Sequence, residues 1–150
     1  MVRTLVWRRL DEPGMEIARV ESFARAEGTQ IGAAYEARWR LDGDRLDVQV
    51  VGADRRTVEL GDADFFDVFA SPFFNSLPVM RDGLLVHGPA RNYVMRFVTL
   101  PELDVVRSQQ RYEPRGGRVV RYSSGSFAAD IAFDPDGFVM SYEGFLERIA

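Results

Sequence analysis

The sequence predicts a mainly all-β fold: one curved antiparallel sheet of about ten strands, a half-barrel or open barrel, with few short helices. Three segments alternate apolar and polar residues with the period of two expected of half-buried strands: Ile31–Leu41, Arg45–Val51 and Ser126–Asp134. Turn signals recur roughly every eight to twelve residues, as in β-barrels and sandwiches. Helical periodicity is almost absent. These observations together favour an antiparallel meander.

The front half is expected to be a meander with a polar outer face. Its strands are predicted at Thr4–Leu10, Met15–Phe23, Ile31–Leu41, Arg45–Val51 and Arg55–Leu60. Its turns are predicted at Asp11–Gly14, Glu27-Gly28 and Asp42-Gly43, where Asp, Pro and Gly favour chain reversal. In the clearest strand, Ile31–Leu41, Trp39 and the other odd-numbered residues share one face, while Glu36, Arg38 and Arg40 share the other.

The stretch Asp67–Leu84 follows a short apolar strand, Phe65–Phe69. Pro72 and Pro78 lack N–H groups and push the residues before them towards extended geometry, so neither suits a helix interior or a central strand. We therefore predict an ordered, extended loop. The residues expected to hold it are Phe73 and Leu77, through burial, and Asn75, through hydrogen bonds to nearby loop backbone.

The back half is expected to be more apolar. Its strands are predicted at Asn92–Thr99, Asp104–Glu113, Val119–Ser123, Ser126–Asp134 and Phe138–Tyr142, with turns at Gly116-Gly117 and Asp134–Gly137. The first of these strands is apolar on both faces except at Arg96. The last segment, Gly144–Ala150, is expected to form a helical turn or two.

Composition narrows the class of protein. A chain of 150 residues without repeats or linkers fits a single domain, residues 1–150. The net charge of −4 argues against a nucleic-acid partner. The absence of cysteine excludes disulfides and thiolate chemistry. No run reaches transmembrane length and no signal-peptide pattern is present, so the sequence predicts a cytoplasmic protein without an integral membrane segment.

Catalytic and metal-binding motifs are weak. His87 is the single histidine, it lies in a predicted surface loop, and no G-x-S-x-G elbow accompanies it. The D-P-D-G stretch at Asp134–Gly137 lacks the flanking helices and the position-twelve glutamate of a calcium-binding EF-hand. We therefore expect no metal, no cofactor and no catalytic group, although a carboxylate pair for glycoside hydrolysis stays open because acidic residues are plentiful.

Aromatic residues are the most informative feature. Eleven phenylalanines, five tyrosines and two tryptophans exceed what one side of a small core needs. A curved sheet with such an inner face would form a dry groove, or the rings would pack on each other or on a dimer partner. The groove is predicted to use some of Trp39, Tyr93, Met95, Phe97, Phe127, Ile131 and Phe133. Arg96 would either meet a ligand head group or pair with Asp130 or Glu113.

Several motifs occur in a family-specific order: Trp7, L-D-E-P-G-M-E (10–16), Trp39, S-P-F-F-N-S-L-P (71–78), V-T-L-P-E-L-D-V (98–105), Q-R-Y (110–112) and D-P-D-G-F-V with Y-E-G-F (134–145). In these motifs the chain resembles the putative glycolipid-binding family of bacterial proteins over nearly its whole length. The resemblance implies a fold similar to bacterial lipoprotein carriers, whose curved sheet holds acyl chains. Phe74 stands where threonine is commoner, and a tryptophan expected between Leu60 and Phe65 is missing.

Three functions follow as hypotheses. The first is non-catalytic binding of an amphipathic ligand, such as a glycolipid or fatty acyl compound, with the tail in an apolar groove and the head at a polar rim. The alternatives are a hydrolase acting on a similar ligand and a small interaction protein with a homodimer face. The candidate ligand-binding residues are Trp39, Phe73, Asn75, Met95, Arg96, Phe97, Gln110, Arg111, Tyr112 and Phe127.

Overall fold

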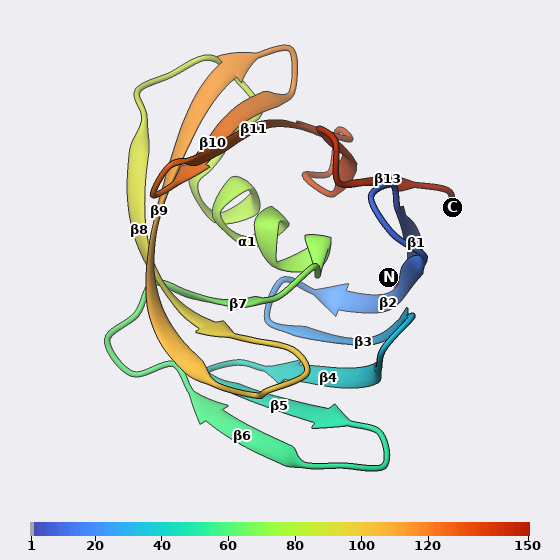
Figure 1. The fold of residues 1–150 in the computed structure, drawn as a ribbon. Coiled ribbons are helices and arrows are strands. Elements are labelled where there is room, and N and C mark those ends of the chain that lie inside the picture. Colours follow the sequence, from blue (N-terminus) through green and yellow to red (C-terminus); the bar gives the residue numbers. More distant parts are fainter. Residues whose placement is uncertain (1) are drawn as a thin grey trace.

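The computed structural model describes residues 2–150 as one open sheet of 13 strands with one helix. The strands are β1 (Arg3–Arg9), β2 (Gly14–Ser22), β3 (Arg25–Gly32), β4 (Glu36–Asp42), β5 (Arg45–Val50), β6 (Arg55–Glu59), β7 (Phe65–Val68), β8 (Arg91–Val98), β9 (Val105–Gly116), β10 (Val119–Ser124), β11 (Phe127–Phe133), β12 (Val139–Tyr142) and β13 (Leu146–Arg148); the helix α1 spans Pro72–Asp82. The sheet curls around α1 (Figure 1). The mainly β, curved and open architecture predicted from the sequence is confirmed.

The front strands run β6-β5-β4-β3-β2-β1 as an antiparallel meander. The segment expected to be one strand, Ile31–Leu41, is two: the chain turns at residues 33–35, where the Gly32 N–H donates to the Tyr35 carbonyl at 2.9 Å. The turn expected at Glu27-Gly28 is wrong as well, because both residues lie inside β3. Gly28 is needed there: a Cβ on it would sit 2.4 Å from the Trp39 ring.

The stretch expected to be an extended loop is the helix α1, which is the main correction to the predicted fold. Pro72 occupies the first helical turn, where a missing N–H costs nothing. Pro78 does remove an internal hydrogen bond, but every residue from Pro72 to Val79 is buried, and this packing outweighs the local cost. Gly83 ends the helix in the left-handed conformation, with φ of 66°. The predicted burial of Phe73 and Leu77 is confirmed.

Helix α1 also explains the one parallel pairing among the described strands. Strand β7 pairs parallel with β8, and parallel neighbours need a crossover, which α1 supplies on the concave side of the sheet (Figure 1). The expectation of a wholly antiparallel sheet is therefore wrong at this edge. Strands β7 and β6 form the two ends of the strand order, so the sheet stays open.

The C-terminal segment closes the gap between the two halves of the sheet. Residues expected to form a helical turn are strand β13, which pairs with β1 on one side and β12 on the other. The indole N–H of Trp7 on β1 donates to the Val139 carbonyl on β12 at 2.8 Å. The short apolar strand expected at Phe65–Phe69 is β7, and the additional strand β13 and the splitting of Ile31–Leu41 bring the total to 13 where about ten were expected.

The core lies between the concave face of the sheet and α1. Trp39 stacks on Phe73 at 5.2 Å between ring centroids and meets Phe74 edge-on at 4.8 Å. On the other side, Tyr93 and Tyr112 form an edge contact at 5.5 Å. These rings fix α1 inside the curve of the sheet and thereby place its first turn beside the cavity described next.

Candidate ligand-binding pocket

The concave side of the sheet contains an inner pocket of about 420 Å³, which is within the usual range for ligand sites. It lies between the first turn of α1 and the strands β10 to β13. The lining residues are Asp11, Asp67, Val68, Phe69, Ala70, Ser71, Pro72, Asn75, Phe97, Tyr122, Phe127, Tyr142, Glu143, Gly144, Phe145 and Leu146. We call this cavity the inner pocket.

Aromatic rings form the walls of the inner pocket. Tyr122 contacts Phe127 edge-on at 6.1 Å and Tyr142 at 6.0 Å, and Tyr142 contacts Phe145 at 5.1 Å. Phe97 adds a fifth ring from β8. Phe127 is half exposed, at 51%, whereas the Tyr122 and Tyr142 rings are buried, so the wall runs from the solvent inwards. Such a wall suits an apolar chain.

The floor of the inner pocket is polar. The Asp67 carboxylate, from β7, is 8% exposed and accepts a hydrogen bond from Gln110 Nε2 at 2.8 Å. Burial raises the pKa of the Asp67 carboxyl to about 7, although the Gln110 amide opposes the rise. Asn75, on the first turn of α1, donates through Nδ2 to the Tyr112 hydroxyl at 3.2 Å. The floor thus offers a carboxyl and an amide at the end of an aromatic wall.

A second buried carboxylate, Glu16, lies on the other side of the first turn of α1. It accepts hydrogen bonds from Trp39 Nε1 at 2.9 Å, Ser71 Oγ at 2.8 Å and Gln30 Nε2 at 3.3 Å. Burial raises the pKa of the Glu16 carboxyl to about 7 as well. The space beside it is only about 20 Å³, room for about one water molecule. This side of the turn is closed.

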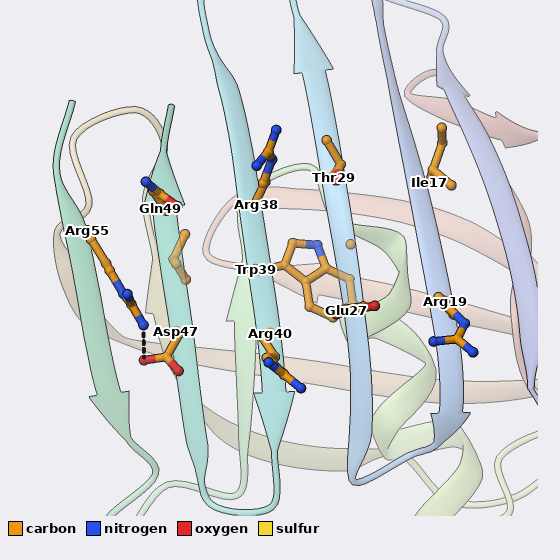
Figure 2. A pocket seen from close by; sticks show the side chains of 12 residues that line it. Ile17, Arg19, Glu27, Thr29, Arg38, Trp39, Arg40, Asp47, Gln49 and Arg55 are labelled. Atoms are coloured by element: carbon orange, nitrogen blue, oxygen red, sulfur yellow. Dashed lines mark ion pairs between the residues drawn. The ribbon is translucent and has the colours of Figure 1, made fainter. Parts of the chain in front are cut away.

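A different hollow, of about 480 Å³, lies on the outer face of strands β2 to β6 (Figure 2). The strand register places Arg19, Glu27, Arg40 and Asp47 side by side on successive strands, so that charge alternates across the sheet. Arg55 lies 3.9 Å from Asp47. Alternating charges of this kind stabilise neighbouring strands. Since the hollow is open and charged, we assign it to the solvated face of the sheet.

Three of the ten candidate residues line the inner pocket: Asn75, Phe97 and Phe127. Four others belong to the core: Trp39, Phe73, Met95 and Tyr112. Gln110 lies behind Asp67, which it contacts. Arg96 and Arg111 follow the alternation of their strands onto the opposite, outer face. Of the other residues expected in the groove, Tyr93, Ile131 and Phe133 are core residues.

Two expected contacts of these candidates are wrong. Asn75 bonds the Tyr112 hydroxyl, and the backbone bonds expected in a loop are replaced by those of a helix. Arg96 pairs with neither expected acid, because Asp130 lies 3.2 Å from Arg121 and Glu113 lies 3.1 Å from Arg115. The Arg96 Nε atom is buried without a hydrogen-bond partner in the described chain.

Several pocket residues were not identified from the sequence, above all Asp67. Its signal was present: Asp67 is the single charged residue in the apolar run Phe65–Phe69, just as Arg96 is in its own strand. The rings of Tyr122, Tyr142 and Phe145 had no comparable signal, because their shared position depends on strand pairing far apart in the chain.

Neither a metal centre nor a membrane span is evident among residues 2–150. No cluster of three His, Cys, Asp or Glu side chains there could hold a metal ion. The helix that the structure describes is too short to cross a bilayer.

Comparison with known proteins gives one family match and one similar structure. A family model described as putative glycolipid-binding matches residues 33–148. A DUF1089 family protein from Pseudomonas aeruginosa has a similar fold, with a TM-score of 0.62 and 21% sequence identity over 99% of this chain and 91% of that one. A search of curated proteins found no match.

Proposed function

Because the chain belongs to the putative glycolipid-binding family, we propose that it is a non-catalytic binding protein for an amphipathic ligand, such as a glycolipid or a fatty acyl compound. The observation that carries this proposal is the inner pocket, which joins a wall of aromatic rings to a buried polar floor. An apolar chain buried against such a wall gains about 0.8 kcal/mol per methylene, so a short chain suffices for measurable binding.

The pocket is well suited to a chain because it is open and its wall is aromatic. Phe127 at the mouth is half exposed, and an apolar ring kept in water is stabilised when a guest covers it. The rings of Tyr122 and Tyr142 continue the same surface towards Asp67. A ligand with an apolar and a polar end therefore matches both parts of the cavity.

Two measurements test the proposal. Native mass spectrometry of the purified protein should show a co-purified lipid or glycolipid. Uptake of a fluorescent acyl probe should fall at least tenfold in Phe127→Asp, which places a charge on the pocket wall. Phe23→Asp is the matched control, because Phe23 is also exposed, at 56%, but does not line the pocket. If wild type takes up no probe, or if both variants lose uptake equally, the proposal fails.

Hydrolysis is the second candidate, and the raised pKa of Asp67 favours it. A carboxyl with a pKa of about 7 is suited to act as a general acid near neutral pH. Glycoside hydrolysis also needs a second carboxylate, and the two other acids of the pocket, Asp11 and Glu143, lie at its exposed mouth. Incubation with nitrophenyl glycosides and esters separates the two functions: binding without product release excludes hydrolysis of these substrates.

A further inference from the structure

We propose that Asp67 is the head-group acceptor of the inner pocket, and that the pocket takes a neutral, hydroxylated head group in preference to a carboxylate or a phosphate. This inference rests on the proposed function, and it specifies the ligand class and its orientation. The head would lie at the floor beside Asp67 and Asn75, with the chain along the rings towards the mouth. This orientation is the reverse of the one expected from the sequence, in which the tail lies inside the groove and the head group lies at a polar rim.

The charges around the pocket disfavour an anionic head. Among the described residues that line it, three are acidic and none is basic. The arginines that contact the two outer acids are engaged by them: Arg9 donates two hydrogen bonds of 2.8 Å to Asp11, and Arg121 lies 3.5 Å from Glu143. An anion at the floor would lose its hydration without gaining a counter-ion, which is strongly unfavourable.

The floor retains hydrogen-bonding capacity that the protein does not use. Glu16 receives three donors from its surroundings, whereas Asp67 receives one side-chain donor, Gln110. The Gln110 Oε1 atom is buried and has no partner among residues 2–150. Gln110 does not line the inner pocket, so the group that can receive a donor from outside the chain is the Asp67 carboxyl, which does line it.

A neutral hydroxyl fits this floor better than a cation does. Tyr112, Tyr122 and Tyr142 lie near Asp67, and all three are uncharged near neutral pH; burial raises the pKa of each phenol still further above it. Burial also raises the pKa of Asp67 to about 7, so its carboxyl exchanges between charged and neutral forms. A hydroxyl can donate to the carboxylate and accept from the carboxylic acid. An ammonium group can pair only with the charged form.

Three probes with the same eight-carbon chain test this inference by calorimetry at a pH of about 6.5, below the pKa of Asp67: octyl glucoside, below its micelle concentration, octanoate and octylamine. Wild type should bind octyl glucoside at least tenfold more tightly than either charged probe. Asp67→Leu should weaken octyl glucoside binding about tenfold. Asp67→Asn, which keeps the shape and the hydrogen bonds, should change octyl glucoside binding less than threefold and should strengthen octanoate binding.

Glu16→Gln is the control variant, because it changes a buried carboxyl outside the pocket, and it should leave the probe order unchanged. Circular dichroism on each variant confirms folding.

Octanoate binding as tightly as octyl glucoside would overturn the inference and leave the proposed function standing. If octylamine bound most tightly, the inference of a neutral head group would be wrong and the pocket would prefer a cationic one. An unchanged affinity in Asp67→Leu would remove Asp67 from the site. Binding of none of the three would overturn both proposals.

Discussion

The first turn of α1 separates two buried carboxyl groups with opposite surroundings. Residues Ala70, Pro72 and Leu146 line both cavities and so form the wall between them. On one side Glu16 faces three donors and about 20 Å³ of free space; on the other Asp67 faces one side-chain donor and about 420 Å³. Both carboxyls have a pKa of about 7, so the pKa alone does not distinguish them.

The two carboxyl groups differ in how many hydrogen-bond donors they receive from the protein and in whether a ligand can reach them. The Glu16 network ties β2, β3, β4 and the start of α1 together, which is a structural role. Asp67 is also buried, but it accepts one side-chain hydrogen bond, from Gln110, and it borders an open pocket. A buried carboxyl with a raised pKa that borders a pocket is a candidate for a functional site. The following predictions test this division.

The largest effect is expected at Glu16. Glu16→Ala should lower the free energy of unfolding by about 4 kcal/mol, because Trp39 Nε1 and Ser71 Oγ lose their acceptor and a cavity remains. Glu16→Gln should cost less than about 1 kcal/mol, since an amide can accept from the indole and donate to the hydroxyl. Urea denaturation measures both. Equal losses in the two variants would mean that the network does not stabilise the fold.

The second effect is a pH dependence of stability. The pKa values of Glu16 and Asp67 are raised above their unfolded values, so the folded state keeps protons that the unfolded chain has lost. The free energy of unfolding should therefore fall as the pH rises from about 4.5 to about 7, by on the order of 3 kcal/mol per carboxyl. Asp67→Asn should remove about half of this loss, and Glu16→Gln the other half. Denaturation curves that keep the full slope in either variant would contradict the assignment.

A smaller effect is expected at Gly28, which supports the closed side alone. Gly28→Ala should cost about 2 kcal/mol, because the new methyl would overlap the Trp39 ring that donates to Glu16. The folded variant should still take up an acyl probe, because Gly28 does not line the inner pocket. Gly88→Ala is the control, because the added methyl would meet only the Val86 carbonyl, at an ordinary contact distance of 4.0 Å, and Gly88 has no positive φ. Loss of probe uptake in folded Gly28→Ala would show that the two sides are coupled.

The smallest effect on stability is expected on the open side. Asn75→Ala should cost about 1 kcal/mol, because it removes the hydrogen bond to the Tyr112 hydroxyl while water in the pocket can partly replace it. Thermal melting of the variant beside wild type measures the change. A loss as large as that of Glu16→Ala would mean that the floor of the pocket is structural.

The sequence was sufficient for most strands but not for the helix. Alternation of apolar and polar residues located β5 and β11 within a few residues, because burial of one face is a local property of a strand. Segments between turn signals located β6, β8, β9, β10 and β12. Helix α1 was missed because Pro78 argues against a helix interior, and burial of Pro72–Val79 against strands distant in the chain overrides that preference. Local patterns do not contain that information.

The site shows the same division. Phe97, Phe127 and Asn75 were among the candidates from the sequence, since aromatic and amide residues stand out in their segments. The contact between Glu16 and Trp39 joins residues 23 positions apart, and it depends on Gly28 between their strands. Asp67 could have been found by the rule that singled out Arg96, a charged residue in an apolar strand. The sequence alone does not show which face of the sheet Asp67 and Arg96 occupy, because that depends on the parallel pairing of β7 with β8.

The most direct measurement compares the two carboxyl groups in one sample. Carboxyl carbon resonances in an NMR spectrum can be assigned to Asp67 and Glu16 with the variants Asp67→Asn and Glu16→Gln. Titration with octyl glucoside should move the Asp67 resonance in a saturable manner and leave the Glu16 resonance in place. A ligand that binds while Asp67 stays unchanged, or one that moves Glu16 instead, would contradict the division between an open, ligand-accepting side and a closed, structural side.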